Sequence, residues 1–100
     1  MVKHIVFFKL SQSVPLENKQ LQLRQLEEIF SPLGKKLPFI VEYRTGINFN
    51  EDSHAWDFAI DSVFRERADL QRYQESNEHL EAIRNGMHIE KSKAVIDYEF

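Results

Sequence analysis

The chain has 100 residues, of which 42% are hydrophobic and 29% are charged, and it carries eight Phe, three Tyr and one Trp. We therefore expect one globular domain over residues 1–100, because a disordered chain lacks so much apolar and aromatic material. Zero Cys excludes disulfides and thiolate metal sites, and a net charge of −3 argues against nucleic-acid partners.

No segment indicates a membrane partner or an export signal. Nothing approaches the roughly 18 consecutive apolar residues of a membrane-spanning helix. The apolar run in residues 1–10 is short, is flanked by Lys3 and Lys9, and lacks a small-residue cleavage site. We expect a cytoplasmic protein, although a chain without Cys is also compatible with an oxidising compartment.

Residues 2–10 alternate with a period of two and are rich in β-branched and aromatic side chains, which predicts a strand. Both faces of this strand are apolar at its middle, whereas a sheet with one wet face alternates cleanly. The strand is therefore expected to be covered twice. One face carries His4, Val6, Phe8 and Leu10. The opposite face carries Lys3, Ile5, Phe7 and Lys9.

Residues 11–15 predict a turn, with Ser13 as a helix cap. Residues 16–30 show the spacing of an amphipathic helix that Pro32 and Gly34 end. Its expected buried stripe consists of Leu23, Leu26, Ile29, Phe30 and Leu33.

The second half predicts two more strands, two helical segments and a last strand. A strand over residues 39–45, broken at Gly46, precedes a polar loop over 48–53 and a strand over 56–64. Residues 65–74 are helical in pattern. A further short helix starts at Asn77, closes at Gly86 and carries Leu80 and Ile83 on its inner side. The chain ends with a strand over residues 94–100.

The resulting order is β-α-β-β-α-β, which predicts a ferredoxin-like α+β sandwich. Such a fold has a four-stranded antiparallel sheet with both helices on one face. Because the first strand is apolar on both faces, we expect a second copy to cover the other face as a homodimer.

Four segments carry a resemblance to a known family: residues 2–10 (VKHIVFFKL), 42–48 (EYRTGIN), 73–80 (YQESNEHL) and 95–99 (VIDYE). In this order and at these spacings they resemble the stress-responsive α/β-barrel (Dabb) domain. The resemblance implies a ferredoxin-like protomer, a dimeric α/β barrel and a stress-associated homodimer of unassigned activity.

A plant polyketide cyclase of that family has a His in its first strand, a Tyr in its second helix and a His six residues later. The matching residues here are His4, Tyr73 and His79, whereas Phe58 stands where the cyclase has a further His. Imidazole exchanges protons near neutral pH, and a phenol can donate to an enolate oxygen. His79 is the candidate base, Tyr73 the oxyanion donor and His4 an orienting partner. The structural alternative is that Tyr73 packs its ring and both imidazoles are satisfied locally.

Apolar residues at core spacing can also line a small ligand pocket between helices and sheet. Packing of an ordinary core is the alternative interpretation of the same spacing. The candidate lining residues are Val6, Phe8, Leu26, Phe30, Phe58, Ile60, Leu80 and Ile83.

No metal and no other cofactor is expected. The four His lack metal-ligand spacing, and carboxylates such as Glu78, Glu81 and Asp97 are scattered. Three functions stay open: a homodimer that binds an apolar ligand, a lyase or cyclase acting on an enolisable carbonyl compound, and a cofactor-free monooxygenase by analogy of fold.

Overall fold

Four strands and four helices follow one another in the computed structural model, which describes residues 1–100. This order confirms the predicted β-α-β-β-α-β pattern, with the first helix continued by one short turn and the second divided in two. The strands are β1 (Val2–Leu10), β2 (Glu42–Ile47), β3 (Phe58–Phe64) and β4 (Lys91–Glu99). The helices are α1 (Leu16–Phe30), α2 (Leu33–Lys36), α3 (Arg67–Glu75) and α4 (Asn77–Gly86).

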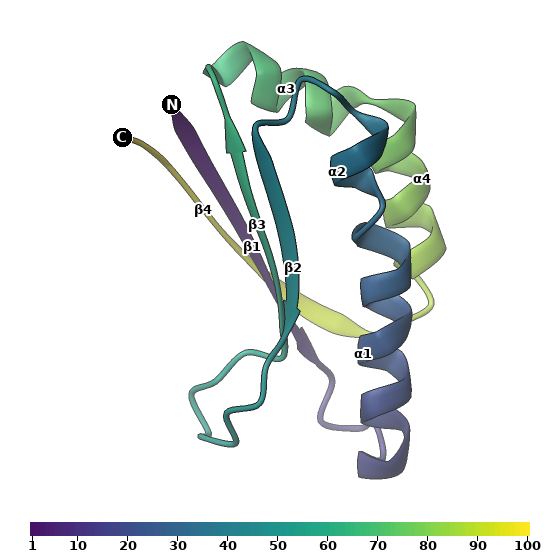
Figure 1. Cartoon of the computed structure of the whole chain (residues 1–100). Coiled ribbons are helices and arrows are strands. Elements are labelled where there is room, and N and C mark those ends of the chain that lie inside the picture. Colours follow the sequence, from purple (N-terminus) through teal and green to yellow (C-terminus); the bar gives the residue numbers. More distant parts are fainter.

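The strands form one antiparallel sheet in the order β2-β3-β1-β4, so β2 and β4 are its edges. All helices lie on one face of this sheet, and the other face is bare (Figure 1). This is the predicted ferredoxin-like sandwich. None of its helices is long and apolar enough to cross a membrane.

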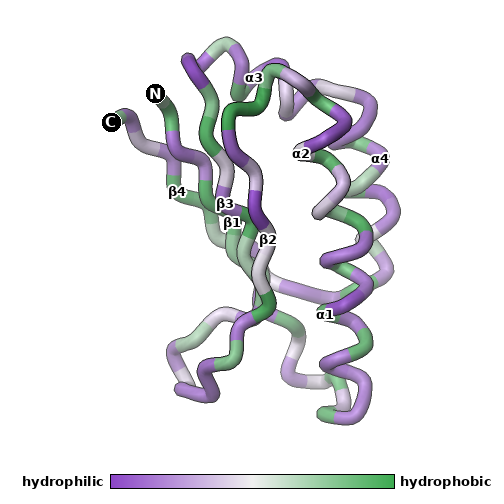
Figure 2. Tube along the Cα trace, in the orientation of Figure 1, coloured by the Kyte–Doolittle hydropathy of each residue, from purple (hydrophilic) through white to green (hydrophobic).

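The two faces of β1 differ in burial as the sequence predicts. His4, Val6 and Phe8 point toward the helices and are buried, whereas Ile5 and Phe7 point outward and are only partly covered. Hydrophobic residues recur along the strands of the sheet and at intervals along the helices (Figure 2). The core therefore lies between one sheet face and the helices, and the outer face keeps apolar side chains with nothing over them.

Four local predictions were wrong. The second strand begins at Glu42 instead of residue 39, since Ile40 N–H donates to the Leu37 carbonyl in a turn. Gly46 does not break that strand but pairs with Ala59 within it. Ser13 does not cap α1, which begins after Pro15 without a side-chain cap. The last strand also starts earlier than predicted, at Lys91.

The buried side of α4 was also predicted wrongly. Leu80 and Ile83 are 47% and 40% exposed, while Ala82 and Gly86 are buried. A Cβ at Gly86 would lie 3.8 Å from side-chain atoms of both Leu26 and Phe30, so α4 approaches α1 through its smallest residues. Close packing against α1 therefore fixes the phase of α4 and leaves its larger apolar side chains outside.

Candidate functional site

His4 occupies the helix side of β1 and is only 4% exposed. The residue paired with it on β4 is Asp97, and the His4 imidazole Nδ1 is hydrogen-bonded to the Asp97 carboxylate. A carboxylate accepts, so Nδ1 carries the proton and Nε2 keeps its lone pair when the ring is neutral. Spacing along the chain cannot show this pair, because its members are 93 residues apart.

Tyr73 and His79 meet at the junction of α3 and α4. Their ring centroids are 4.5 Å apart, and His4 lies 6.2 Å from Tyr73 on the sheet side. Ser76 builds this junction, since its hydroxyl donates to the Tyr73 carbonyl and accepts from the His79 backbone N–H. The structure thus brings the three predicted catalytic residues into one cluster.

The hydrogen bonding of His79 leaves one ring nitrogen free to act as a base. Its Nδ1 lies 3.1 Å from the Gln74 carbonyl oxygen, which can only accept, so Nδ1 carries the proton. Burial lowers the pKa of His79 below 6.5, although the Gln74 carbonyl opposes this shift, and the positive charge of Lys93 lowers the pKa further. The ring is therefore neutral at pH 7, with the Nε2 lone pair available.

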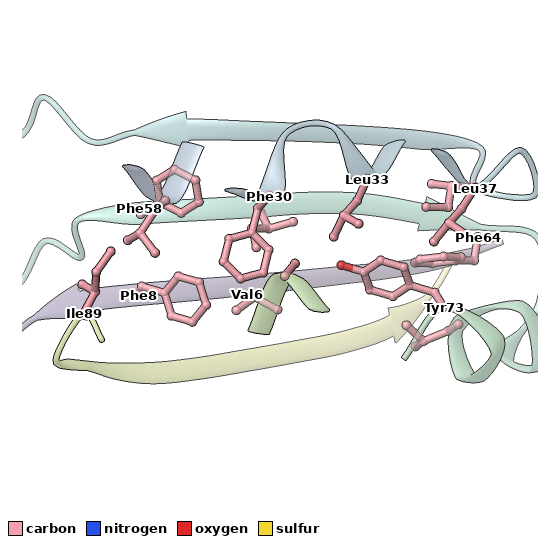
Figure 3. Packing of buried hydrophobic residues seen from close by; sticks show 14 of the residues in the cluster. Val6, Phe8, Phe30, Leu33, Leu37, Phe58, Phe64, Tyr73 and Ile89 are labelled. Atoms are coloured by element: carbon pink, nitrogen blue, oxygen red, sulfur yellow. The ribbon is translucent and has the colours of Figure 1, made fainter. Parts of the chain in front are cut away.

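A second tyrosine, which sequence reasoning did not single out, completes the cluster. The hydroxyl oxygens of Tyr43 in β2 and Tyr73 lie 3.4 Å apart, and burial raises the pKa of both, so both stay protonated. The Tyr73 hydroxyl points into the row of buried side chains between sheet and helices (Figure 3). In such a pair one O–H donates to the other oxygen, and no acceptor meets the second O–H. One hydroxyl hydrogen of the pair therefore has no acceptor within the protein.

The apolar residues predicted to line a ligand pocket separate into two groups. Leu80 and Ile83 are on the surface of α4. The others pack together in the core, where the Phe8 ring lies 5.7 Å from that of Phe30 and 6.3 Å from that of Phe58. The core group is Val6, Phe8, Leu26, Phe30, Phe58 and Ile60. None of the five main hollows of the molecule is lined by His4, Tyr73 or His79.

The β4 edge of the sheet, next to the cluster, is exposed. Val95 pairs with buried Val6 and shares its helix-side face, yet it is 49% exposed, because the helices do not cover β4. The Asp97 side chain, two residues further along this face, is 43% exposed. No group of three His, Cys, Asp or Glu side chains is placed to hold a metal ion.

The structure thus combines a cluster of His and Tyr side chains with a ferredoxin-like antiparallel sheet. The chain belongs to the Stress Responsive A/B Barrel Domain (Dabb) family, whose model matches residues 2–100. Family membership assigns no specific activity. No curated protein gives a significant match to the sequence.

Solved structures with this fold include both uncharacterised proteins and an enzyme. A dimeric ferredoxin-like protein of unknown function from Bacteroides fragilis is 34% identical, with 99% of this chain and 95% of that chain covered and a TM-score of 0.87. A hydroxynitrile lyase from Passiflora edulis is 21% identical, with 97% and 90% covered and a TM-score of 0.74. A Dabb protein from Mesorhizobium loti is 18% identical, with 99% and 95% covered and a TM-score of 0.68.

Proposed function

We propose that the protein is a homodimeric enzyme that moves a proton next to the carbonyl group of a small enolisable compound. The observation that carries this proposal is the part-buried pair of Tyr43 and Tyr73 hydroxyls, which leaves one O–H without a protein acceptor, beside the neutral imidazole of His79. A carbonyl oxygen seated at this pair would supply the missing acceptor.

Each residue then has one role in the step. His79 Nε2 takes the proton from the carbon next to the carbonyl, and the electron pair of that C–H bond moves toward the oxygen. The tyrosine O–H that is not used within the pair donates a hydrogen bond to the developing enolate oxygen, a charge that such a preorganised donor stabilises strongly. The imidazolium of His79 returns the proton to carbon or to a leaving group. His4, held by Asp97, is a positioning residue beside Tyr73.

Apolar surface near the β4 edge suits a substrate with a hydrocarbon part. Val95 on β4 and Leu80 and Ile83 on α4 are each half exposed, although such side chains are usually buried. A hydroxynitrile lyase with the same fold supports lyase chemistry as one form of the reaction. A structural role for the cluster is the alternative, and the same experiment decides between the two.

The test is hydrogen–deuterium exchange at the acidic carbon of a 3-oxo ester in D₂O, followed by ¹H NMR. We expect the wild-type protein to accelerate exchange, and His79→Ala to reduce this acceleration by about 10²- to 10⁴-fold, the usual contribution of a general base. His88→Ala is the matched control, since His88 is exposed and lies outside the cluster. Wild-type exchange no faster than in buffer would reject the proposal.

The dimer forms, in this proposal, through the outer sheet face. Ile96 and Tyr98 on β4 are 50% and 45% exposed there. Lys3 Nζ and the Asp61 carboxylate, also on this face, neutralise each other at 3.0 Å. The relative from Bacteroides fragilis, 34% identical over nearly the full length, is dimeric. Partly covered apolar side chains, paired charges and a dimeric relative all support this surface.

Sedimentation equilibrium tests the surface with two matched variants. Ile96→Lys places a charge on the outer face, and Leu80→Lys places one on α4 at nearly equal exposure. We expect only Ile96→Lys to dissociate the dimer. Equal dissociation constants for the two variants would exclude the outer face.

A further inference from the structure

The loop between β2 and β3, residues 48–57, exposes the aromatic ring of Phe49 to solvent. It extends beyond the sheet on the side away from α1 (Figure 1). Phe49 within it is 96% exposed. Side-chain oxygens hold the loop in shape: that of Asn48 accepts from Asn50 N–H at 2.7 Å, and that of Asp52 from His54 N–H at 2.8 Å. Polar contacts therefore hold the loop, and the Phe49 side chain is left exposed.

A hollow of about 530 Å³ lies at the base of this loop on the outer sheet face. Its floor is one row of the sheet, in which Gly46 pairs with Ala59 and Ala59 pairs with Phe7. Two small residues beside a large one create the depth. A Cβ added at Gly46 would meet no atom within 4 Å, so the space is open.

We infer that this hollow and Phe49 form the contact through which two copies of the chain interlock. The loop of each copy packs on the outer face of the other, and the hollow receives an apolar side chain of the partner. This inference rests on the outer-face dimer of the proposed function and adds the residues that anchor it.

A second copy fits the hollow better than a small ligand does. The floor residues Phe7 and Ala59 belong to the outer face itself, so the hollow is continuous with the proposed interface. The Asn48 side-chain amide is a polar group in the hollow that could recognise a ligand. The loop already uses it, because its Nδ2 donates to the carbonyls of Trp56 and Asn50. The hollow therefore offers mainly apolar surface, which suits an apolar side chain of a partner protein.

The test measures the dimer dissociation constant of three variants by analytical ultracentrifugation. Phe49→Ser removes the exposed ring, and Gly46→Leu adds a side chain to the hollow at a position where a Cβ meets no atom within 4 Å. Leu16→Ser is the matched control, since Leu16 is 84% exposed at the start of α1. We expect the first two to weaken the dimer by roughly tenfold or more, as truncation of interface anchors does, and the control to leave it unchanged.

Each other outcome overturns a different statement. A wild-type protein that is monomeric at micromolar concentration overturns the outer-face dimer and this inference with it. A wild-type dimer whose dissociation constant both variants leave unchanged overturns the interlock alone. If Gly46→Leu leaves the dimer intact but abolishes binding of anilinonaphthalene sulfonate, the hollow is a small-molecule site and the inference is wrong. Near-ultraviolet circular dichroism verifies that each variant is folded.

Discussion

His4 in β1 and Asp97 in β4 are paired across the sheet and joined through their side chains, with the imidazole Nδ1 as donor. The imidazole is buried, whereas the carboxylate is half exposed at the sheet edge. The pair therefore connects the interior cluster of Tyr73 and His79 to the open side of the molecule.

Asp97→Ala is expected to disturb both the site and the fold. Loss of the carboxylate frees the His4 ring to rotate beside Tyr73, and small misplacements of such groups cost on the order of 10- to 100-fold in rate. The carboxylate is half exposed, but the buried His4 Nδ1–H loses its acceptor, so the free energy of unfolding should fall by about 1–3 kcal/mol. Exchange kinetics and urea unfolding measure the two effects. Asp61→Ala, at similar exposure on the outer face, is the control and should leave the exchange rate intact.

Removing the charge of Lys93 should move the pH dependence of the reaction. Lys93 lowers the pKa of His79, so Lys93→Met is expected to raise that pKa toward 6.5 and to shift the acidic limb of the rate profile to higher pH. The ¹H NMR titration of His79 reports the pKa directly. Lys9→Met, on the outer face, should change neither quantity, and an unmoved His79 titration in Lys93→Met would contradict the prediction.

Because of His79, the stability of the protein should fall as the pH drops below 6.5. The pKa of His79 is lower in the folded chain than its usual 6.5, so below that pH the unfolded chain binds more protons. The free energy of unfolding should therefore decrease as pH drops from 6.5 through the folded pKa. In His79→Ala this part of the slope should disappear, while His88→Ala should retain it, as urea titrations at several pH values would show.

Two glycines should respond oppositely to the same substitution. A Cβ at Gly34 would lie 2.7 Å from the Tyr43 Cβ, so Gly34→Ala must displace α2 or β2 and should cost about 1–3 kcal/mol. At Gly46 the same Cβ meets nothing within 4 Å. Gly46→Ala should therefore be neutral or slightly stabilising. Urea denaturation of the two variants gives the comparison, and equal stabilities would show that the backbone near Tyr43 yields easily.

Ser76→Ala should weaken both α4 and the site. Its hydroxyl caps α4 at the His79 N–H, and loss of an N-cap costs about 1 kcal/mol. The same loss should loosen the Tyr73–His79 contact and slow exchange. Ser13→Ala is the control, because Ser13 caps no helix in this structure. Thermal unfolding measures the loss of the helix cap, and exchange kinetics measure the effect on the Tyr73–His79 contact.

Much of the fold follows from period and order alone. The alternation in β1 shows which side chains point inward, and the β-α-β-β-α-β order limits the topology to the observed sandwich. The phase of α4 does not follow, because Ala82 and Gly86 carry little hydropathy although close packing against α1 requires them. Hydropathy favours the larger Leu80 and Ile83, which lie outside.

The site could be predicted only in part for a related reason. His4, Tyr73 and His79 are recognisable from their residue types and from the family resemblance. Asp97 and Tyr43 gain their meaning from strand register and from contacts between distant segments, which local spacing does not encode. An isolated Asp in a terminal strand has the same appearance whether it faces solvent or an imidazole.

The helix-side face of β4 is unusually charged for an edge of this sheet, since it carries Lys91, Lys93, Asp97 and Glu99. An edge strand exposes unpaired N–H and C=O groups that can recruit a strand of another molecule, and charged side chains oppose such pairing. The residues that bring charge to the His–Tyr cluster therefore also keep the open edge from growing into an extended sheet. A variant that binds a wholly apolar substrate at this edge would have to replace these charges. The exposed edge strand would then be more prone to aggregation.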